Sequence, residues 1–563
     1  MENKKSCRNC KKDFLVEPDD TSFYERVKVP PPTWCPECRQ QRRYAWRNER
    51  TLYRRTCDLC GKSTVTIYSP TSPYKVYCPP CWWSDAWDVG KYARDFDFSK
   101  PFFEQYQELQ LAVPRIGLLG KNSVRSEYTN HSSDNKDCYL ITSGVGCENV
   151  MYSNWIMESR DTMDCMYIYT KLERSYECID SHNCYRCQYG IWLRDCNECL
   201  YCYDCRGCTN CFLSMNLRGK SYCFLNQQYT KEEYLKKIGE FNLESYADRK
   251  KLYDQYLELM QNTALHRYVM NENSVNVVGS TISNSKNAYR CFDIEDVEDS
   301  RYCVSGLHFK DCMDCYHFGY KAELNYECHA LVRNYFNRFC HLSYDDSSIT
   351  YCDMCYNSQN LFGCVGVKKG EYLILNKQYT KQDYEELTQK IEKHMRETKE
   401  FGEFFPVELS PFGYNETQGQ VYMPMTKEQV LAKGWKWEDK TSGTYGKETL
   451  QPEQIPDLIS DIQDDIIKQA LKCTSCNRNY NIVKPELDFY RRENIPVPRL
   501  CYDCRYMRRI ALRAPRQLFH RSCICTQSHP QHTGQCPNEF ETPYAPDRKE
   551  KIYCETCYQA EVV

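Results

Sequence analysis

The chain lacks long hydrophobic segments and has almost no net charge. Its 563 residues contain no run of about 18 apolar residues, and the opening Met-Glu-Asn-Lys-Lys-Ser-Cys has no apolar core of a signal peptide. These absences exclude a membrane-spanning helix and lead us to expect a cytoplasmic protein with no membrane partner. The formal net charge is only −3, so any contact with nucleic acid has to come from local basic patches.

The chain also has few of the carboxylate pairs that glycosidic bond cleavage requires. In its central part, Asp345 and Asp346 are the only adjacent acidic pair apart from charges with the pattern of turns. Adjacent strand residues point to opposite faces, so even this pair is poorly placed, and a β-helical carbohydrate-active enzyme is disfavoured. A thiol redox enzyme is a second enzymatic alternative, although four sulfur ligands favour a closed structural zinc site. Its candidate residues are Cys523, Cys525, His529 and His532.

Cysteine, in contrast, is abundant, with 39 residues. In a long chain without a secretion signal, this content favours a reducing compartment and metal-bound thiolates over disulfides. Two Cys-x2-Cys pairs can fill the four corners of a tetrahedral zinc site. The two ends of the chain contain four such sets, which predict about four zinc ions: Cys7, Cys10, Cys35 and Cys38; Cys57, Cys60, Cys78 and Cys81; Cys473, Cys476, Cys501 and Cys504; and Cys523, Cys536, Cys554 and Cys557.

The two ends are copies of one another. Cys7 and Cys473 are 466 positions apart, and the other cysteines of the first and third sets keep that offset. In the fourth set a ten-residue insertion lies inside the first pair, because Cys523 keeps the offset of 466 from its counterpart and Cys536 has an offset of 476. The insertion brings three further candidate ligands, so the residues that complete this site stay open: Cys525, His529 and His532.

Arginines follow the second cysteine pair at each end, again in register. They are Arg39, Arg42, Arg43, Arg47 and Arg50, and Arg505, Arg508, Arg509, Arg513 and Arg516. If the second pair opens a helix, Arg39, Arg43 and Arg47 lie on one face of it. Such a face, with tyrosines nearby, is suited to the phosphate backbone and bases of nucleic acid. The alternative is that these arginines pair with carboxylates in the central part of the same chain.

The central part is a second duplication, with an offset of 150. Met163-Asp164-Cys165 is matched by Met313-Asp314-Cys315, and Tyr176-Glu177-Cys178 by Tyr326-Glu327-Cys328. Within each half cysteines recur every twelve or thirteen residues, which predicts a parallel β-helical solenoid. A coil of twelve residues and a coil of about twice that length fit equally well. We favour an internal ladder of packed cysteines over zinc or iron–sulfur ligation, since the two halves do not keep every cysteine.

These patterns together predict a mainly β protein with helical linkers. Helices are expected over 101–112, 231–262, 381–401 and 456–472, and Thr230 with Glu233 and Thr380 with Asp383 have the spacing of capping boxes. The expected segments are a double zinc module in 1–90, a helical connector in 91–122, solenoid 1 in 123–229, a helical linker in 230–272, solenoid 2 in 273–379, a helix and irregular connector in 380–472, and a second double zinc module in 473–563.

A resemblance to known modules supports the prediction of zinc binding. Residues 7–43, with their cysteine pairs, Phe23-Tyr24 and the Cys-Pro-Glu-Cys-Arg step at Cys35, resemble the small zinc-ribbon modules of bacteria, which are similar in pattern to treble-clef fingers. Residues 473–509 resemble them less closely. As a whole, the chain is similar to large uncharacterised bacterial proteins that are rich in Cys and Tyr and have zinc modules at both ends. The resemblance implies zinc binding and supplies no activity.

Two functions remain from the sequence. The first is a non-enzymatic zinc-binding protein that binds nucleic acid or a ribonucleoprotein through the duplicated arginine helices. The second is a structural scaffold or adaptor whose solenoids present a tyrosine-rich face to a protein partner. Substituting the arginines distinguishes them, because it would weaken binding in the first case and leave partner binding intact in the second.

Overall fold

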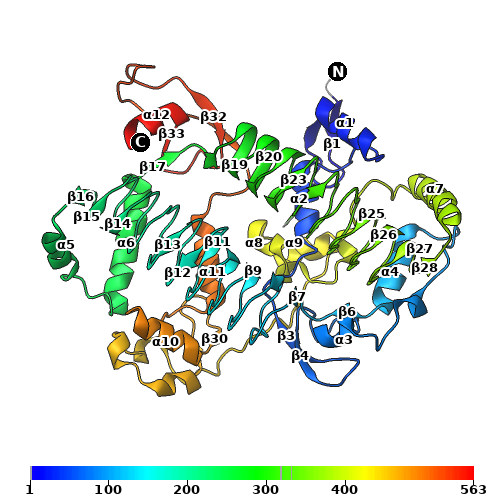
Figure 1. Cartoon of the computed structure of the whole chain (residues 1–563), viewed down its shortest axis with the longest axis horizontal. Coiled ribbons are helices and arrows are strands. Elements are labelled where there is room, and N and C mark those ends of the chain that lie inside the picture. The colour runs from blue at the N-terminus through cyan, green and yellow to red at the C-terminus, as the bar shows by residue number, and fades with distance from the viewer. Residues whose placement is uncertain (1–2, 318–319, 331) are drawn as a thin grey trace. The chain divides into compact units, whose positions relative to one another are not determined.

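The computed structural model describes residues 3–317, 320–330 and 332–563, and it divides into two compact units. Unit 1 joins Met1–Gly117 to Val269–Thr441, and unit 2 joins Leu118–Tyr268 to Ser442–Val563. The N-terminal cysteine module thus belongs to the same unit as the second solenoid, and the C-terminal module to the same unit as the first (Figure 1). Each unit is described separately below.

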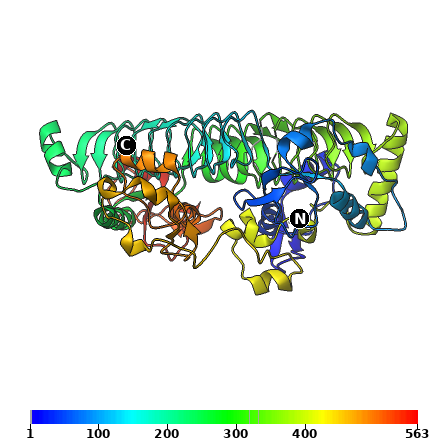
Figure 2. The ribbon, with the colours of Figure 1, turned by 90° about the horizontal axis from the view of Figure 1, so that it is seen from below.

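Each solenoid is a stack of parallel coils of about twelve residues. In unit 2, Asn154 pairs in parallel with Thr142 of the preceding coil and with Met166 of the following one. The chain therefore returns to the same side after twelve residues, which excludes the coil of twice that length. The predicted fold class is confirmed, and Figure 2 shows the stacked coils edge-on.

Most strands of the solenoids are only two to four residues long. In unit 2 they are β7 (Gly120–Lys121), β8 (Ser132–Ser133), β9 (Thr142–Val145), β10 (Asn154–Met157), β11 (Met166–Ile168), β12 (Leu172–Glu173), β13 (Cys184–Tyr185), β14 (Thr209–Phe212) and β15 (Ser221–Phe224). In unit 1 they are β18 (Asn271–Glu272), β19 (Val275–Ser283), β20 (Lys286–Glu295), β21 (Glu298–Arg301), β22 (Val304–Leu307), β23 (Phe309–Lys310), β24 (Ala322–Glu323), β25 (Ser347–Thr350), β26 (Gln359–Phe362) and β27 (Glu371–Ile374).

Within a coil, the backbone repeats every three residues. Met163 pairs with the neighbouring coils, Asp164 has a left-handed conformation with φ 56°, and the Cys165 side chain is buried inside the coil. The left-handed position recurs along both solenoids and accepts Tyr, Trp and Glu as well as the expected Asn and Asp. It turns the chain at each corner, and at Asp164 its side chain contacts arginines outside the coil.

Hydrogen bonds between coils compensate for the cost of these left-handed residues, which is about 1 to 2 kcal/mol each. The N–H of Met163 donates to Ser175 O of the next coil at 3.0 Å, and the N–H of Asp164 donates to Met151 O of the previous coil at 3.1 Å. The third N–H, that of Cys165, donates to the buried Ser153 hydroxyl at 3.0 Å. All three backbone donors of the triplet are therefore satisfied, which explains the small polar residues inside the coils.

The buried cysteines of the solenoids form the internal ladder. The Cys147 thiol, for example, donates to Ile156 O of the next coil at 3.4 Å. All cysteines between Cys138 and Cys223 and between Cys291 and Cys364 are buried. Among the described residues of the solenoids, no three potential ligand atoms approach one another as metal ligands do. The preference for ladder packing over ligation in this part agrees with that geometry.

Some coils are not twelve residues long. Arg160 pairs with Glu173, thirteen positions later, and Val275 pairs with Lys286, eleven positions later. In the shorter coil the register shifts between Val278 and Gly279. Gly279 has φ +145°, and a Cβ there would lie 1.8 Å from Cys291 O, so only glycine allows the two coils to approach. The length of a coil therefore varies by one residue in either direction, and the thirteen-residue coil occurs in both halves, since Lys310 pairs with Glu323.

Helices cover the last coil of each solenoid. α5 (Lys231–Ile238) contacts β15, and α7 (Lys381–Glu397) contacts β27. Each follows a short antiparallel strand, β16 (Gln227–Gln228) or β28 (Lys377–Gln378). The expected capping box forms at Thr230, whose hydroxyl accepts from Glu233 N at 3.2 Å while the Glu233 carboxylate accepts from Thr230 N. At Thr380 the hydroxyl accepts from Asp383 N at 3.1 Å and caps α7. These elements pair or cover edges that would otherwise be open.

The remaining helices agree with the sequence in part. α4 (Phe102–Ala112) forms as predicted, and α6 (Tyr246–Asn262) follows α5 after a short break. The helix expected over 456–472 is wrong. The chain there forms two short 3-10 turns, Ile459–Asp461 and Asp464–Lys468, and then the strand Leu471–Lys472, although its isoleucines have helical spacing and are buried in one core. Among the described residues, no helix is both long and apolar enough to cross a membrane.

Candidate metal centres and the arginine dock

Each terminal module contains two centres built to one plan. A short hairpin holds the first two cysteines, and the third cysteine caps a helix whose first turn holds the fourth. The hairpins are β1 (Asn3–Ser6) with β2 (Asp13–Val16), β3 (Tyr53–Thr56) with β4 (Ser63–Thr66), β29 (Leu471–Lys472) with β30 (Asn479–Tyr480), and β31 (Phe519–Ser522) with β32 (Glu539–Thr542). The helices are α2 (Pro36–Tyr44), α3 (Pro79–Trp83), α11 (Tyr502–Leu512) and α12 (Glu555–Val562).

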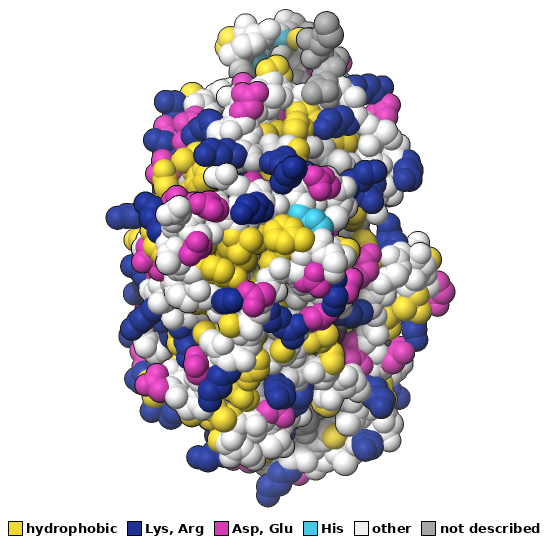
Figure 3. All heavy atoms as spheres, turned by 90° about the vertical axis from the view of Figure 1, so that its right-hand side faces the viewer, with side chains coloured by type: hydrophobic (Ala, Val, Ile, Leu, Met, Phe, Trp, Pro, Cys, Tyr) yellow, Lys and Arg dark blue, Asp and Glu magenta, His cyan; other side chains and the backbone are white. Residues whose placement is uncertain are grey.

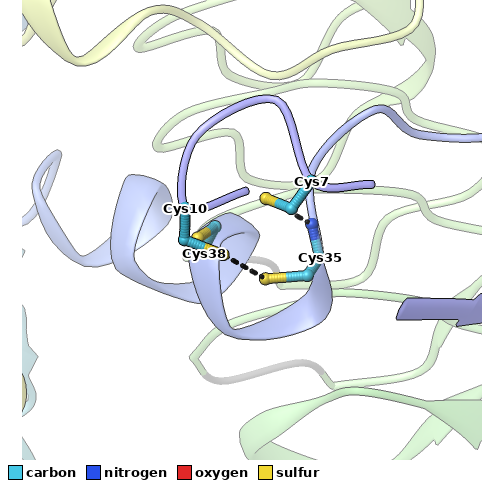
Figure 4. Close-up of side chains that lie close together, drawn as sticks. All are labelled: Cys7, Cys10, Cys35 and Cys38. Carbon is cyan, nitrogen blue, oxygen red and sulfur yellow. Dashed lines mark hydrogen bonds between the residues drawn. The ribbon is translucent and has the colours of Figure 1, made fainter. Parts of the chain in front are cut away.

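The first centre shows the geometry common to all four (Figure 4). The sulfur atoms of Cys7, Cys10, Cys35 and Cys38 lie within 4.8 Å of one another. The Cys35 N–H donates to Cys7 Sγ at 3.2 Å, and the Sγ atoms of Cys10 and Cys35 are 3.7 Å apart. The corresponding N–H to Sγ contacts of the other three centres measure 3.2 to 3.3 Å. The four predicted cysteine sets are therefore each brought together and could each hold a metal ion.

The surroundings of the first cysteine favour its ionised form. Burial would raise the pKa of Cys7, but N–H groups of Cys10 and Cys35 outweigh that effect and lower the pKa to about 7. The pKa of Cys57 is lowered to about 6 against burial by the N–H groups of Cys78 and Cys60. Thiolates are the form that binds metal, and the N-terminus of a helix stabilises negative charge beside it.

Among the described residues, only the fourth centre has a second group of potential ligands beside it. Cys525, His529, His532 and Cys557 also place one ligand atom each within 4.8 Å of one another, so Cys557 belongs to two groups. The alternative ligands suggested by the insertion thus do not replace members of the cysteine set. They form a separate group beside it.

The arginines of unit 1 lie against the second solenoid. Arg39 Nη2 is 2.7 Å from Asp314 Oδ2, and Arg43 Nη2 is 3.0 Å from Asp314 Oδ1. Arg43 Nη1 also contacts Glu327 Oε2 at 3.2 Å, and Arg42 Nη2 contacts Glu327 Oε1 at 2.7 Å. Burial raises the pKa of the Glu327 carboxyl, while Arg42 and Arg43 lower it. Two buried carboxylates thus share three buried guanidinium groups, an arrangement that we call the arginine dock.

Unit 2 repeats the arginine dock with the equivalent residues. Arg505 Nε is 2.9 Å from Asp164 Oδ2, and Arg509 Nη1 lies 2.8 Å from Asp164 Oδ1 and 2.9 Å from Glu177 Oε1. Arg508 Nη2 lies 2.9 Å from Glu177 Oε1. Figure 1 shows α11 beside the coils of this unit. Asp164 and Glu177 are both at left-handed positions, which direct their side chains outward to the helix.

A tyrosine and a further carboxylate complete both docks. In unit 1 the Tyr302 hydroxyl donates to Asp20 Oδ2 at 3.0 Å, and in unit 2 the Tyr152 hydroxyl donates to Glu486 Oε2 at 2.7 Å. These carboxylates come from α1 (Pro18–Arg26) and α10 (Lys484–Arg492), the helices before the second cysteine pair. The module is therefore held on its solenoid from two helices.

The arginine helices are shorter than the sequence suggested. α2 ends at Tyr44 and α11 at Leu512, so Arg47 and Arg513 lie beyond the helices rather than on their faces. Arg47 contacts Glu49, His317 and His329, and Arg513 Nε is 2.8 Å from Asp180 Oδ2. Arg516 donates to the Tyr167 hydroxyl at 2.8 Å, and Arg50 is half-buried.

Burial decides how these side chains can act. Arg39, Arg42, Arg43, Arg505 and Arg509 are each at most 2% exposed. A phosphate group could reach them only if the module left the solenoid. The nucleic-acid prediction made for them stays a prediction, and their places in this fold do not support it.

The sequence analysis gave pairing with carboxylates of the central part as an alternative, but it did not single out the carboxylates of the docks. Asp164, Glu177, Asp314 and Glu327 nevertheless stand in the duplicated Met-Asp-Cys and Tyr-Glu-Cys signatures. The arginines repeat at an offset of 466 and these carboxylates at an offset of 150. Two duplicated sets of opposite charge indicate that the sets pair with each other. Comparison with known proteins found no family model that matches the chain and no curated protein similar to it.

Proposed function

We propose that this chain is a non-enzymatic, zinc-stabilised scaffold whose solenoids bind protein partners. The observation that carries the proposal is the arginine dock, which occurs at equivalent residues in both units. The arginines were the main argument for nucleic acid, and their pairing with Asp314, Glu327, Asp164 and Glu177 gives them an internal role instead. The zinc modules then serve to hold a charged helix against each solenoid.

Zinc suits these centres better than other metals. Four thiolates in a compact, closed arrangement are the usual ligand set of structural Zn²⁺. Each centre also positions the start of the helix that follows it, and in two of them this helix carries dock arginines. A centre closed by four sulfur atoms leaves no position for a substrate, which argues against metal-assisted catalysis there.

Binding of nucleic acid through the dock would be costly. Breaking a buried ion pair and leaving one charge unpaired costs about 3 to 5 kcal/mol, and each dock contains several such pairs. The exterior offers no evident substitute on the face drawn in Figure 3, where Lys and Arg side chains are intermixed with Asp and Glu rather than forming a broad basic area. Unspecific attraction to phosphate depends on such an area.

Two tyrosines are the residues we propose to face a partner. Tyr185 and Tyr335 are 150 positions apart and therefore equivalent, and both are exposed, at 37% and 51%. Single exposed aromatics are common on protein surfaces. Here, however, the same position is exposed and aromatic in both copies, and tyrosine is frequent where proteins meet.

The first experiment tests nucleic acid. Fluorescence anisotropy with labelled single-stranded DNA, double-stranded DNA and RNA at low salt should detect no binding by the zinc-loaded full chain. Binding that weakens when Arg43 and Arg509 are replaced by glutamine, in variants whose circular dichroism is unchanged, would overturn the proposal.

The second experiment tests the partner surface. Cross-linking in cell extract, read by mass spectrometry, should identify proteins attached to the wild type that are lost from the Tyr185→Ser and Tyr335→Ser double variant. Leu431→Ser is the matched control, since Leu431 is 51% exposed but lies outside the solenoids in α9 (Lys427–Ala432). Partners that persist in the tyrosine variant, or that are lost equally in the control, would contradict this surface.

A further inference from the structure

The fourth metal centre is the only one of the described centres with a second group of ligands beside it. Its cysteine set, Cys523, Cys536, Cys554 and Cys557, has the contacts of the other centres: the Cys554 N–H donates to Cys523 Sγ at 3.2 Å, and the Sγ atoms of Cys536 and Cys554 are 3.9 Å apart. Nothing in this set is displaced by the inserted residues. The insertion therefore adds ligands to a complete centre.

The added histidines are held by a tight hairpin. The N–H of His529 donates to His532 O at 3.0 Å, and the N–H of His532 donates to His529 O at 3.2 Å. Pro530 and Gln531 form the turn between them. Both rings consequently reach the same point, where His529 Nε2 is 3.3 Å from Cys525 Sγ and His532 Nε2 is 3.1 Å from Cys557 Sγ.

One histidine has the second contact that metal-bound histidines usually have. His532 Nδ1 lies 2.9 Å from Gly534 O, an acceptor, so Nδ1 bears the proton and donates it. The lone pair of Nε2 is then directed toward Cys557 and is available to a metal. This tautomer is the one that a zinc site requires.

Charge supplies a third argument. Four thiolates around a single Zn²⁺ leave a charge of −2. Two Zn²⁺ ions bound by these four thiolates, the Cys525 thiolate and two neutral histidines leave only −1. All five cysteines of the cluster are buried, so the lower charge matters for stability.

We propose that the C-terminal module holds two zinc ions that share the Cys557 thiolate. One ion would have the ligands Cys523, Cys536, Cys554 and Cys557, and the other Cys525, His529, His532 and Cys557. The chain would then bind five zinc ions rather than the four that the cysteine pairs predict. This inference rests on the zinc binding proposed above and is independent of the scaffold role.

The N-terminal module provides an internal control. Cys81 is equivalent to Cys557 in its own centre, but among the described residues it belongs to one ligand group only. Zinc per chain, measured by elemental analysis of the full protein, should be five in the wild type and four in Cys81→Ser. In Cys557→Ser it should fall to three, because both ions lose a ligand. Loss of one zinc from each of the two cysteine variants would overturn the sharing.

The histidines are tested without touching the cysteine set. The His529→Ala and His532→Ala double variant should hold four zinc ions, and His520→Ala, which removes an exposed histidine that contacts Glu539 and Glu541, should hold five. Equal counts in wild type and double variant would overturn the second ion. A wild type with no bound zinc at all would instead refute the zinc proposal itself.

A measurement on the wild type avoids the risk that a variant misfolds. After replacement of zinc by ¹¹³Cd, the two ions of the C-terminal module should give resonances that are coupled to each other through the shared sulfur. Resonances without such coupling would show two separate sites and contradict the bridge.

Discussion

In units 1 and 2 a terminal module packs on a solenoid, and the two units have equivalent residues where the charges are most deeply buried. Asp314 and Glu327 in unit 1 occupy the places of Asp164 and Glu177 in unit 2, and all four are at most 4% exposed. Each pair of carboxylates meets three arginines of the packed module. The agreement indicates that this cluster is the common requirement for placing a module on a solenoid.

The units differ toward the rim of the dock. In unit 1, Glu403 of the connector contacts Arg42 Nη1 at 2.8 Å, and the Arg42 side chain is 3% exposed. In unit 2, no such contact is found for Arg508 among the described residues, and its side chain is 30% exposed and lies over the Tyr253 ring. The duplicated charge clusters are therefore covered by different residues in the two units, by Glu403 in unit 1 and by Tyr253 in unit 2.

The largest expected effect comes from metal removal, which should break both units in the same way. Structural zinc contributes about 10 to 16 kcal/mol of apparent binding energy in finger peptides. We expect a chelator to release the amides of both terminal modules to rapid hydrogen exchange, whereas the coils stay protected because their hydrogen bonds run between coils. Mass spectrometry of peptides from each region measures this. Coils that exchange as fast as the modules would contradict it, and added zinc should restore protection.

Neutralising the shared aspartate should separate module from solenoid in one unit at a time. Asp314→Asn leaves Arg39 and Arg43 short of charge, and Asp164→Asn does the same to Arg505 and Arg509. Each substitution should cost about 3 to 5 kcal/mol, since it removes one side of a buried ion pair. Hydrogen exchange of α2 in the first variant, and of α11 in the second, reports the loss.

A surface pair serves as the matched control for these variants. Asp311 contacts Arg26 at 2.9 Å near the surface, so Asp311→Asn should cost no more than about 1 kcal/mol. Similar effects of Asp314→Asn and Asp164→Asn would show that the two docks contribute equally to stability. A large effect in one unit and none in the other would contradict their equivalence.

One expected pH effect in unit 1 comes from Glu416. Burial raises the pKa of the Glu416 carboxyl from 4.5 to about 7, although the Tyr53 hydroxyl and the Gly413 N–H lower it. Because the folded pKa is raised, the contribution of this group is fully present below about pH 4.5 and is lost as pH rises through about 7. Unit 2 has Phe519 at the position of Tyr53 and lacks this hydroxyl.

Glu416→Gln should therefore stabilise unit 1 at pH 8 by up to about 3 kcal/mol and change little at pH 5. The amide can donate to Tyr53 and accept from Gly413, as the protonated carboxyl does. Thermal unfolding of wild type and variant across this pH range, with zinc present, measures the difference. A gain that is equal at both pH values would show that the carboxyl does not titrate there.

Much of the fold was readable in the sequence, because its signals are local. The duplications, the period of the cysteines and the cap at Thr230 all involve neighbouring residues or regular spacing. The partner of an arginine is not a local signal, because Arg43 and Asp314 are 271 positions apart. In addition, a guanidinium binds carboxylate and phosphate with the same geometry. Only the return of the chain to its own solenoid decides between them.

Local sequence signals did not predict the backbone conformation at positions where tertiary packing determines it. The left-handed corners accept Tyr167 and Trp155, which no propensity would place there, because hydrogen bonds between coils hold the backbone. The second metal group of the C-terminal module was visible only as surplus ligands. Its separation from the cysteine set depends on the His529 hairpin, whose fold the sequence alone did not reveal.

The smallest expected effect concerns a ladder position at which the two copies differ. Cys364 in unit 1 corresponds to Ser214 in unit 2, 150 positions earlier. The Cys364 thiol donates to Phe362 O at 3.6 Å and accepts from Asn376 N at 3.5 Å. The Ser214 hydroxyl makes the same two contacts, donating to Phe212 O at 3.0 Å and accepting from Asn226 N at 3.3 Å.

Cys364→Ser should therefore cost about 1 kcal/mol or less, because a buried hydroxyl is costly mainly when its hydrogen bonds are unmade. Zinc per chain should not change, in contrast to Cys38→Ser, which removes a ligand of the first centre. Chemical unfolding and elemental analysis of both variants make the comparison. A loss of metal in Cys364→Ser would mean that the ladder thiols bind it after all. A loss of several kcal/mol without loss of metal would mean that the two copies are not interchangeable at this position, and that sulfur in the coil supplies packing that the shared hydrogen bonds do not.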